Sequence, residues 1–592
     1  MTALLGALLL LAAPPTAEEA RAFASRVDAD LKALTTRANV SEWIKNTYIT
    51  DDTERAAAWA NEEVMAYTAR AIRESLRFQG AEIDPDVRRM LLLLRVNTDF
   101  PPSPADPARR AELASIASRL GGMYGKGKWC GKDGKGPCRS LADLEEVMRR
   151  SRRADELLDA WTGWHGIAVP MRPLYERFAS LANEGARQMG FGDLGEQWRA
   201  GYDMSPEAFA AETDRLWDQV RPLYQALHCY VRARLAAFYG KEKVPPDGPI
   251  PAHLLGNMWA QEWGNVYPLV EPYHGVPSLD VEAGMKRRKW DAVRMVKAGE
   301  AFFSSLGFDP LPRTFWERSM LVKPRDRDVV CHASAWDIDY QSDLRIKMCI
   351  KVNEEDLVTI HHELGHNYYQ RAYEKQPFLF QAGANDGFHE AIGDALALSV
   401  GPAYLAKLGL VSAAPVDERR LVDVQMKDAL EKIAFLPFGL LVDRWRWDVF
   451  SGKTPPSRYD AAWWELRRRL QGVAPPVERT EADFDPGAKM HVPFNVPYTR
   501  YFLARILQFQ FHRAMCRIAG HRGPLYACSI HGNAEVGRRL QAMLAMGASR
   551  PWPDALEALT GERQMDATAI LDYFAPLRKW LDEQNRGRTC GW

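Results

Sequence analysis

Apolar residues recur at steps of three and four positions along most of the chain, which is the spacing of one face of an α-helix. The clearest examples are segments 141–164, 206–239 and 496–519. The strict alternation that is typical of strands is rare, and residues 328–351 are the best candidate for a short β-hairpin. We therefore predict an all-α fold with very little sheet.

Proline-rich breaks interrupt this pattern at residues 100–107, 244–252 and 473–477. Periodic apolar segments resume directly after each break, which is typical of loops rather than of linkers between domains. The 592 residues show no internal repeat. The pattern predicts one large all-α domain over residues 18–592, with the size to form two lobes.

The N-terminus begins with an apolar run from Ala3 to Ala13. This run is too short to span a bilayer but long enough for the core of a signal peptide, which we place at residues 1–17. No Lys or Arg precedes it and no clean A-x-A site follows it, so a mis-assigned start or an apolar N-terminal helix remains the alternative. No later stretch reaches 18 uninterrupted apolar residues, and we predict no membrane anchor.

Charge and cysteine content narrow the class of protein. Lys and Arg together balance Asp and Glu at 77 each, so net charge gives no argument for a nucleic-acid partner, and none is predicted. Six of the eight cysteines form compact pairs that can each close a local loop: Cys130 with Cys138, Cys331 with Cys349, and Cys516 with Cys528. Such pairs are typical of an oxidising compartment and predict export to the periplasm or the extracellular space.

Two cysteines, Cys229 and Cys590, are left over. They either pair with each other or remain two free buried thiols, and the sequence does not choose between these alternatives. No cysteine sits in a C-x-x-C arrangement, so a zinc site made of cysteines is not expected.

The segment TIHHELGHNYYQ, residues 359–370, contains the strongest chemical signal. Asn353 can cap a helix there, and i and i+4 positions share one helix face, so His362 and His366 point the same way. Glu363 is too close in sequence to join the same metal shell but can stand over an open coordination position as a general base. This is the H-E-x-x-H arrangement of zinc peptidases, although a structural helix can carry it too.

A third ligand decides between these interpretations. Glu390 follows His366 by 24 positions in the segment GANDGFHEAIGDALALS, and Asp394 lies four residues further on the same helix face. An antiparallel helix would bring Glu390 to the metal and set Asp394 behind a ligating histidine, where it would accept the free ring N–H. Two histidines, one carboxylate and an open position predict catalytic rather than structural zinc.

Several motifs now resemble the angiotensin-converting enzyme family of zinc dipeptidyl carboxypeptidases. They are HHELGH, GFHEAIGDALALS, CHASAWD at 331–337, DFDPGAK at 483–489 and VPYTRYF at 496–502. The resemblance runs from about residue 20 to Trp592, and the single catalytic unit is similar to the family's single-domain members, including bacterial ones. It implies a two-lobed helical zincin fold around a deep central channel, with three disulfides that match the local cysteine pairs.

The resemblance also implies roles for residues that spacing alone leaves as ordinary core or surface positions. It matches the zinc ligands and the base to those above, and Tyr501 with His491 to the groups that stabilise the oxyanion. His332 and Ala333 would hold the substrate backbone. Gln261, Lys489 and Tyr498 would hold the substrate's C-terminal carboxylate, for which a lysine is a suitable anchor.

Chloride is a further implied ligand. The resemblance assigns one chloride site to Arg172, Trp463 and Arg467, and another to Tyr224 and Arg500; a solvated helix face is the alternative for Arg467. One departure concerns Ala382, which stands where vertebrate members carry Glu directly before the GAN-G stretch. The substrate preference of those members on that side therefore does not carry over to this chain.

Three functions fit these observations to different degrees. The first is a zinc peptidyl-dipeptidase that acts on oligopeptides with a free C-terminal carboxylate. The second is a zinc carboxypeptidase that removes one residue, but that branch of the family has Arg where Gln261 stands. The third is a non-catalytic peptide-binding protein, against which the intact set of metal and catalytic residues argues.

Overall fold

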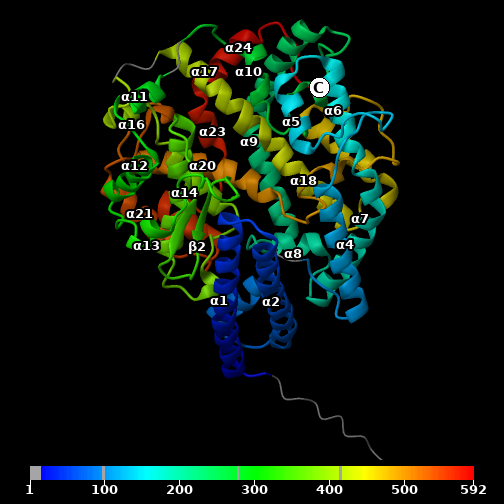
Figure 1. Ribbon diagram of the computed structural model, residues 1–592, viewed down its shortest axis with the longest axis vertical. Coiled ribbons are helices and arrows are strands. Elements are labelled where there is room, and N and C mark those ends of the chain that lie inside the picture. Colours follow the sequence, from blue (N-terminus) through cyan, green and yellow to red (C-terminus); the bar gives the residue numbers. More distant parts are fainter. Residues whose placement is uncertain (1–14, 97–100, 277–278, 413–416) are drawn as a thin grey trace, which may run out of the picture.

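The computed structural model describes residues 15–96, 101–276, 279–412 and 417–592, and the apolar run Ala3 to Ala13 lies outside them. Helices dominate throughout these ranges (Figure 1). The α-helices of the N-terminal half are α1 (Ala17–Thr47), α2 (Asp51–Ser75), α3 (Pro85–Arg95), α4 (Pro107–Gly125), α5 (Leu141–Arg150), α6 (Ala154–Gly166), α7 (Arg172–Gln188), α8 (Leu194–Ala200), α9 (Pro206–Tyr239), α10 (Tyr267–Val270), α11 (Val281–Arg287), α12 (Ala292–Ser305) and α13 (Arg313–Arg318).

The remaining α-helices include the two that carry the H-E-x-x-H and Glu390 motifs, α14 and α15. They are α14 (Glu354–Ala372), α15 (Phe388–Ala397), α16 (Pro402–Lys407), α17 (Glu418–Asp428), α18 (Ala434–Phe450), α19 (Tyr459–Leu466), α20 (Thr499–Ile518), α21 (Ala534–Leu544), α22 (Trp552–Thr560), α23 (Thr568–Tyr573) and α24 (Ala575–Gln584). The all-α prediction is confirmed.

Strands are few and short in the described chain. The predicted hairpin is present: β2 (Ser334–Asp337) pairs antiparallel with β3 (Leu344–Lys347). A second strand pair was not expected. In this pair, β1 (Ile250–Pro251) lies parallel to β4 (Val473–Ala474), and each strand falls within one of the proline-rich breaks. These two breaks are therefore loops that contact each other.

The helices form two groups with the long helices α9 and α20 between them. In Figure 1, α12, α14 and α21 lie to the left, while α4 to α7 and α18 lie to the right. One hydrophobic cluster runs through both groups, from Leu113 to Leu581. The two-lobed helical prediction agrees with this arrangement.

The first three helices have a small core of their own. Phe23, Leu31 and Leu91 belong to a separate apolar cluster contributed by α1, α2 and α3. In Figure 1, α1 and α2 run side by side and project beyond the rest of the molecule. Asp28 connects them to the main body by accepting hydrogen bonds from the backbone N–H groups of Phe378 and Leu379 (3.1 and 2.8 Å).

Two glycines let α14 and α15 cross in contact. A Cβ at Gly365 would lie 2.9 Å from Cα of Gly393, and a Cβ at Gly393 would lie 2.9 Å from the backbone oxygen of His362. Any side chain at either position would separate the helices. The Gly in the H-E-L-G-H motif and the Gly in A-I-G-D therefore bring Glu390 to the histidines.

Four disulfides join the cysteines of the described chain, and the described residues contain no free cysteine. Three are the predicted local pairs. The fourth settles the open alternative, because Cys229 on α9 is bonded to Cys590, 361 residues further along. Within the described residues, no helix combines the length and apolar character that a membrane span requires.

Candidate metal centre and peptide site

The side chains of the three predicted zinc ligands lie close together. Nε2 of His366 lies 3.0 Å from Nε2 of His362, which lies 3.6 Å from Oε2 of Glu390. Ligands about 2.0–2.1 Å from a tetrahedral zinc are about 3.3 Å apart, so these separations suit a single ion. The donor set of two imidazoles and one carboxylate is also the set that catalytic zinc prefers. The residues therefore fit zinc.

Asp394 holds one of the ligating rings, as predicted. Nδ1 of His362 donates to Oδ1 of Asp394 (3.0 Å), which turns Nε2 toward the other ligands. Oδ2 of Asp394 in turn accepts from Arg505 on α20 (2.5 Å). Burial would raise the pKa of Asp394, but Arg505 and the imidazole hydrogen bond outweigh it and hold this pKa far below its ordinary value. Asp394 is thus a fixed anion behind the metal.

The other ligating ring has a partner that the sequence did not suggest. Nδ1 of His366 lies 3.3 Å from Nδ1 of His389, whose Nε2 is 3.1 Å from the hydroxyl of Tyr373. The His389 ring also stacks on Tyr369, with centroids 4.4 Å apart. Burial lowers the pKa of His389 to about 4, so the ring is neutral. The only sequence signal was its place beside Glu390 in the motif GFHEA.

Glu363 lies in the interior next to the ligands, with 7% of its surface exposed. Burial raises the pKa of its carboxyl above the ordinary value, while His362 acts in the opposite direction. A carboxylate with a raised pKa takes up a proton more readily, which suits a general base.

Tyr501 and His491 lie together near the metal. Their rings are 5.5 Å apart between centroids, and the Tyr498 ring is 4.6 Å from His491 and 5.1 Å from Tyr501. Burial and the nearby cations lower the pKa of His491 to about 2, so this ring is neutral. Its Nδ1 is buried without a partner among the described residues. The group therefore combines a phenol with an imidazole nitrogen that has no partner among the described residues.

The three residues predicted to hold the substrate carboxylate converge. Nζ of Lys489 donates to Oε1 of Gln261 (2.6 Å), and the Tyr498 hydroxyl lies 3.3 Å from the same oxygen. The ammonium is 4.1 Å from the Trp259 ring centroid, a neighbour that sequence reasoning missed. Burial lowers the pKa of Lys489 to about 7, although Glu262 raises it. Tyr498 connects this anchor to Tyr501.

The hairpin brings the predicted backbone-binding segment alongside α14. Ala333 directly precedes β2, and Nδ1 of His332 lies 2.9 Å from the Ala333 oxygen. Lys347 on β3 fixes this segment by donating to the backbone oxygen of His332 (2.6 Å). The charges of His332 and Lys347 also act on the Glu363 carboxyl, so the segment lies close to the proposed base.

The predicted chloride residues have hydrogen-bond partners within the chain. Arg172 is paired with Glu481 (2.7 Å) and Glu176 (3.3 Å). Arg467 is 1% exposed, donates to the Trp259 oxygen (2.9 Å), and lies over the Trp463 ring at 5.9 Å. A chloride shared by Arg172, Trp463 and Arg467 stays a prediction.

Tyr224 and Arg500, which form the second predicted chloride site, have different neighbours. The Tyr224 hydroxyl donates to the Gln471 oxygen (2.5 Å), and Tyr224 acts electrostatically on Arg467 instead. The tyrosine beside Arg500 is Tyr202, which hydrogen-bonds Asp386. Nε of Arg500 lies 3.1 Å from Oδ2 of Asp386, so a carboxylate of the chain already neutralises this arginine. Chloride binding stays a prediction.

Ala382 lies just after a short 3₁₀ turn, where its backbone N–H donates to the Phe380 oxygen (2.9 Å). Its methyl group offers no charge to a substrate. The preference on this side of the site stays open to measurement.

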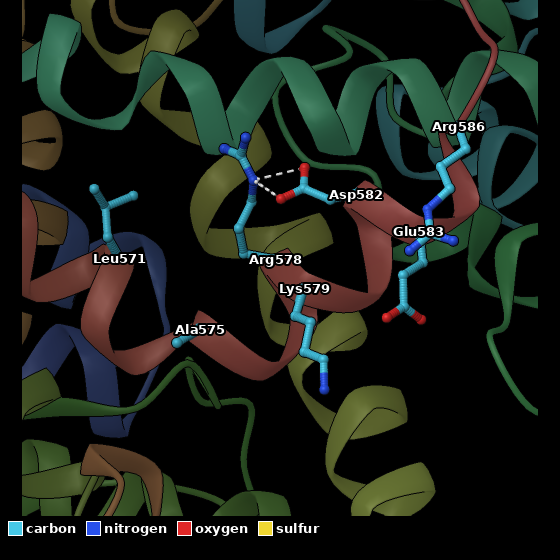
Figure 2. A pocket seen from close by; sticks show the side chains of 7 residues that line it. All are labelled: Leu571, Ala575, Arg578, Lys579, Asp582, Glu583 and Arg586. Atoms are coloured by element: carbon cyan, nitrogen blue, oxygen red, sulfur yellow. Dashed lines mark hydrogen bonds and ion pairs between the residues drawn. The ribbon is translucent and has the colours of Figure 1, made fainter.

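A surface hollow on α24 and the end of α23 shares no residue with the metal centre. Figure 2 shows its charged side chains, among which Arg578 donates to both oxygens of Asp582 (2.9 and 3.0 Å). Its lining residues are Leu571, Ala575, Arg578, Lys579, Asp582, Glu583 and Arg586. Three basic and two acidic side chains line it, and none of them belongs to the metal centre or the carboxylate anchor.

The helical fold and the H-E-x-x-H site with a distant glutamate have the arrangement of the zincin-type fold. The family model for angiotensin-converting enzyme matches residues 14–592. The chain is 44% identical to the angiotensin-converting enzyme of Mus musculus over 590 residues, and 40% identical to that of Theromyzon tessulatum over 562 residues. The chain therefore belongs to the angiotensin-converting enzyme family.

The lengths of these relatives differ. The alignment covers 98% of this chain but 44% of the Mus musculus protein, and 97% of this chain but 44% of the Bos taurus protein. The alignment to the Theromyzon tessulatum protein covers 94% of this chain and 90% of that relative. This chain thus spans less than half of the mammalian proteins and nearly all of the shorter one.

Proposed function

We propose that the chain is a zinc-dependent peptidyl-dipeptidase that releases dipeptides from the free C-terminus of oligopeptides. The observation that carries this proposal is the continuity of two sites. The carboxylate anchor of Gln261, Lys489 and Tyr498 adjoins Tyr501 through the contact between the Tyr498 and Tyr501 rings (5.1 Å). A peptide held at the anchor extends toward the metal ligands.

Zinc held by His362, His366 and Glu390 would lower the pKa of a bound water and polarise the scissile carbonyl. Glu363 accepts the proton of the attacking water and then delivers it to the leaving amine. Asp394 keeps the His362 ring in one orientation, so that Nε2 remains a ligand throughout. Arg505 keeps Asp394 ionised, so Asp394 does not take up a proton and continues to accept the His362 hydrogen bond.

Tyr501 and His491 serve the oxygen that becomes negative. The phenol of Tyr501 donates a hydrogen bond to it, because burial raises the pKa of Tyr501 above its ordinary value and keeps the proton in place. The neutral His491 ring supports this group through the adjoining Tyr498 and Tyr501 rings.

The neutral Gln261 makes the anchor suitable for a dipeptide. Its amide oxygen accepts a hydrogen bond from the Lys489 ammonium. The other N–H groups of that ammonium remain available for the substrate carboxylate. An arginine in this position would place a second cation against Lys489 and reach further into the pocket. The Gln261 side chain thus leaves space for two residues beyond the scissile bond.

We also propose that the protein is exported and that chloride affects it only weakly. Four disulfides support an oxidising compartment, the periplasm or the extracellular space. The pairing of Arg500 with Asp386 and of Arg172 with Glu481 leaves each guanidinium with a carboxylate of the chain itself.

Hydrolysis of a hippuryl tripeptide tests the proposed function. We expect release of hippurate and a dipeptide, loss of activity with a chelator, and recovery with added zinc. Glu363→Gln should retain zinc and lose roughly 10²–10⁴-fold in turnover, the usual scale for a general base. Release of a single amino acid would indicate a carboxypeptidase, and zinc binding without turnover in the wild type would indicate a binding protein.

A further inference from the structure

A second cavity, away from the metal centre, lies between α2 and α4. Its volume is about 780 Å³, and its walls include Ile72 from α2, Leu76 directly after α2, Leu113 from α4, and Met189 after α7. Small-molecule sites typically occupy roughly 300–1,000 Å³ and are mainly apolar. None of the metal ligands and none of the anchor residues line it.

The wall opposite α2 is fixed to the main body. The N–H of Ala105 donates to Oε1 of Gln188 on α7 (2.6 Å). Gly185 packs so closely on the loop that a Cβ there would lie 2.2 Å from the Pro102 oxygen. Both Pro102 and Ala105 line the cavity. The cavity is thus part of the packed structure.

Three arginines line this cavity without a carboxylate partner among the described residues. Arg70 lies over the Tyr67 ring (5.7 Å), and Arg110 donates to the backbone oxygens of Pro104 and Ala105 (3.2 and 3.1 Å). Arg73 has no recorded hydrogen bond or ion pair in the described chain. Burial and the charges of Arg110 and Arg70 lower the pKa of Arg73. An anion would relieve this repulsion.

One carboxylate, Glu62, also lines the cavity. It lies on α2 eight residues before Arg70, which places it roughly 12 Å away along the helix. The positive charge is therefore concentrated at the other end, around Arg70, Arg73 and Arg110.

A buried acceptor without a partner lies in the cavity lining. Gln197 on α8 is 2% exposed, and its amide nitrogen donates to the Arg95 oxygen (2.9 Å). Its Oε1 has no hydrogen-bond partner within the described part of the chain. A buried polar atom in a native protein normally has a partner, and an N–H or O–H donor of an occupant would satisfy this oxygen.

We propose that this cavity binds an apolar chain that carries both an amide N–H and a free carboxylate. The apolar walls take the chain, Gln197 accepts from the N–H, and the three arginines hold the carboxylate. A simple fatty acid has no donor for Gln197, and a neutral or cationic ligand would leave the arginines unmatched. An N-acyl amino acid and the C-terminal end of an apolar peptide share this chemistry.

Calorimetric titration of the zinc-loaded full chain with N-octanoylglycine tests the proposal. We expect one saturable site per chain. Octanoylglycinamide, which lacks the carboxylate, and decanoate, which lacks the N–H, should each bind about tenfold or more weakly, a difference of about 1.4 kcal/mol. The peptide Ac-Leu-Leu-Leu, titrated into the Glu363→Gln variant, shows whether a peptide end or only an acyl amino acid enters.

Three variants locate the binding site. Arg73→Gln combined with Arg110→Gln should weaken N-octanoylglycine binding about tenfold or more, as should Gln197→Leu. Ala69→Trp should abolish binding by filling the cavity. Arg55→Gln is the matched control, because Arg55 is an exposed arginine on the same helix that does not line the cavity. All variants should keep wild-type hydrolysis of the hippuryl tripeptide, which shows that they fold.

The opposite pattern would overturn the proposal. If Lys489→Ala removed the binding while the Ala69→Trp variant retained it, the ligand would be occupying the carboxylate anchor. Equal binding of decanoate and N-octanoylglycine would also contradict the role of Gln197. Because binding is measured apart from hydrolysis, the peptidase proposal and the cavity proposal fail independently.

Discussion

Lys489 shows how a single buried residue connects the fold to the expected pH response. Burial lowers its pKa to about 7, and Glu262 and Glu145 only partly oppose this effect. The proposed anchor needs the charged form, because a free peptide C-terminus would offer a carboxylate. Free enzyme therefore loses its anchor as the pH rises through about 7.

We predict that kcat/KM for the hippuryl tripeptide falls above about pH 7, mainly through a rising KM. Lys489→Arg is the control, since an arginine stays protonated over this range. Its kcat/KM should be lower at pH 7 but should not fall further toward pH 9. Parallel profiles for both proteins would show that another group causes the decline.

Asp386 is the residue that sets our expectation for chloride. Its Oδ2 lies 3.1 Å from Nε of Arg500 and supplies that guanidinium with a negative charge. We predict that wild-type activity changes less than about twofold between chloride-free buffer and about 0.15 M chloride, where exposed charges are already largely screened.

Asp386→Asn removes this charge and keeps the shape. It should lower activity in chloride-free buffer, and chloride should then restore it by about fivefold or more, the usual range of coupling between sites. Acetate in place of chloride controls for ionic strength. A wild type that is strongly activated by chloride would contradict the assignment of Asp386 as the internal anion.

At the scale of elements, the contact between α14 and α15 decides whether the ligands meet. A Cβ at Gly393 would lie 2.8 Å from Nδ1 of His362, the atom that donates to Asp394. We predict that Gly393→Ala pushes the helices apart, lowers zinc affinity by about 10- to 100-fold, as for loss of a supporting partner, and reduces activity accordingly. Zinc content after dialysis against a chelator series measures this.

Gly122→Ala in α4 is the matched control, because a Cβ there meets nothing within 4 Å. In a helix interior this change should stabilise the folded protein by roughly 0.5–1 kcal/mol and leave its zinc affinity unchanged. Equal zinc affinity in the two variants would mean that zinc binding does not require the close approach of α14 and α15.

The elements also show what could be predicted from the sequence. The apolar period over 206–239 coincides with α9, and the hairpin and the spacing of His362, His366 and Glu390 were predictable because they depend on local periodicity. The helical spacing over 141–164 belongs to two helices, α5 and α6, which are separated after Arg150.

Pairings between distant segments could not be predicted in the same way. The β1–β4 pair joins residues more than 200 positions apart and consists of two residues in each strand. The placement of Tyr202 rather than Tyr224 beside Arg500 has the same origin, because resemblance of motifs does not locate isolated residues that lie outside the motifs. Only the packed structure distinguishes the two tyrosines.

At the scale of the whole molecule, the Cys229–Cys590 disulfide closes almost two thirds of the chain. Arg232 reinforces it by donating to the Thr589 oxygen (2.6 Å), and Trp592 packs against His228 at 4.7 Å between ring centroids. A loop this long corresponds to about 5 kcal/mol of stabilisation or more in the chain-entropy model.

We predict that Cys229→Ser combined with Cys590→Ser lowers the apparent Tm measurably at a fixed scan rate. Removal of a native disulfide usually lowers the free energy of unfolding by about 2–5 kcal/mol. The same double change at Cys130 and Cys138, which are 8 residues apart, is the control and should have a smaller effect. An equal or larger effect of the short loop would contradict the role of loop length.

The most direct test of the proposed function is to read the first products from one decapeptide by mass. The wild-type protein is given the decapeptide with a free C-terminus and, separately, the same peptide with an amidated C-terminus. The structure predicts that the first product is shorter by two residues and that the amidated peptide stays largely uncut, because Lys489 and Gln261 recognise a carboxylate. A first product shorter by one residue, or equal cleavage of both peptides, would contradict it.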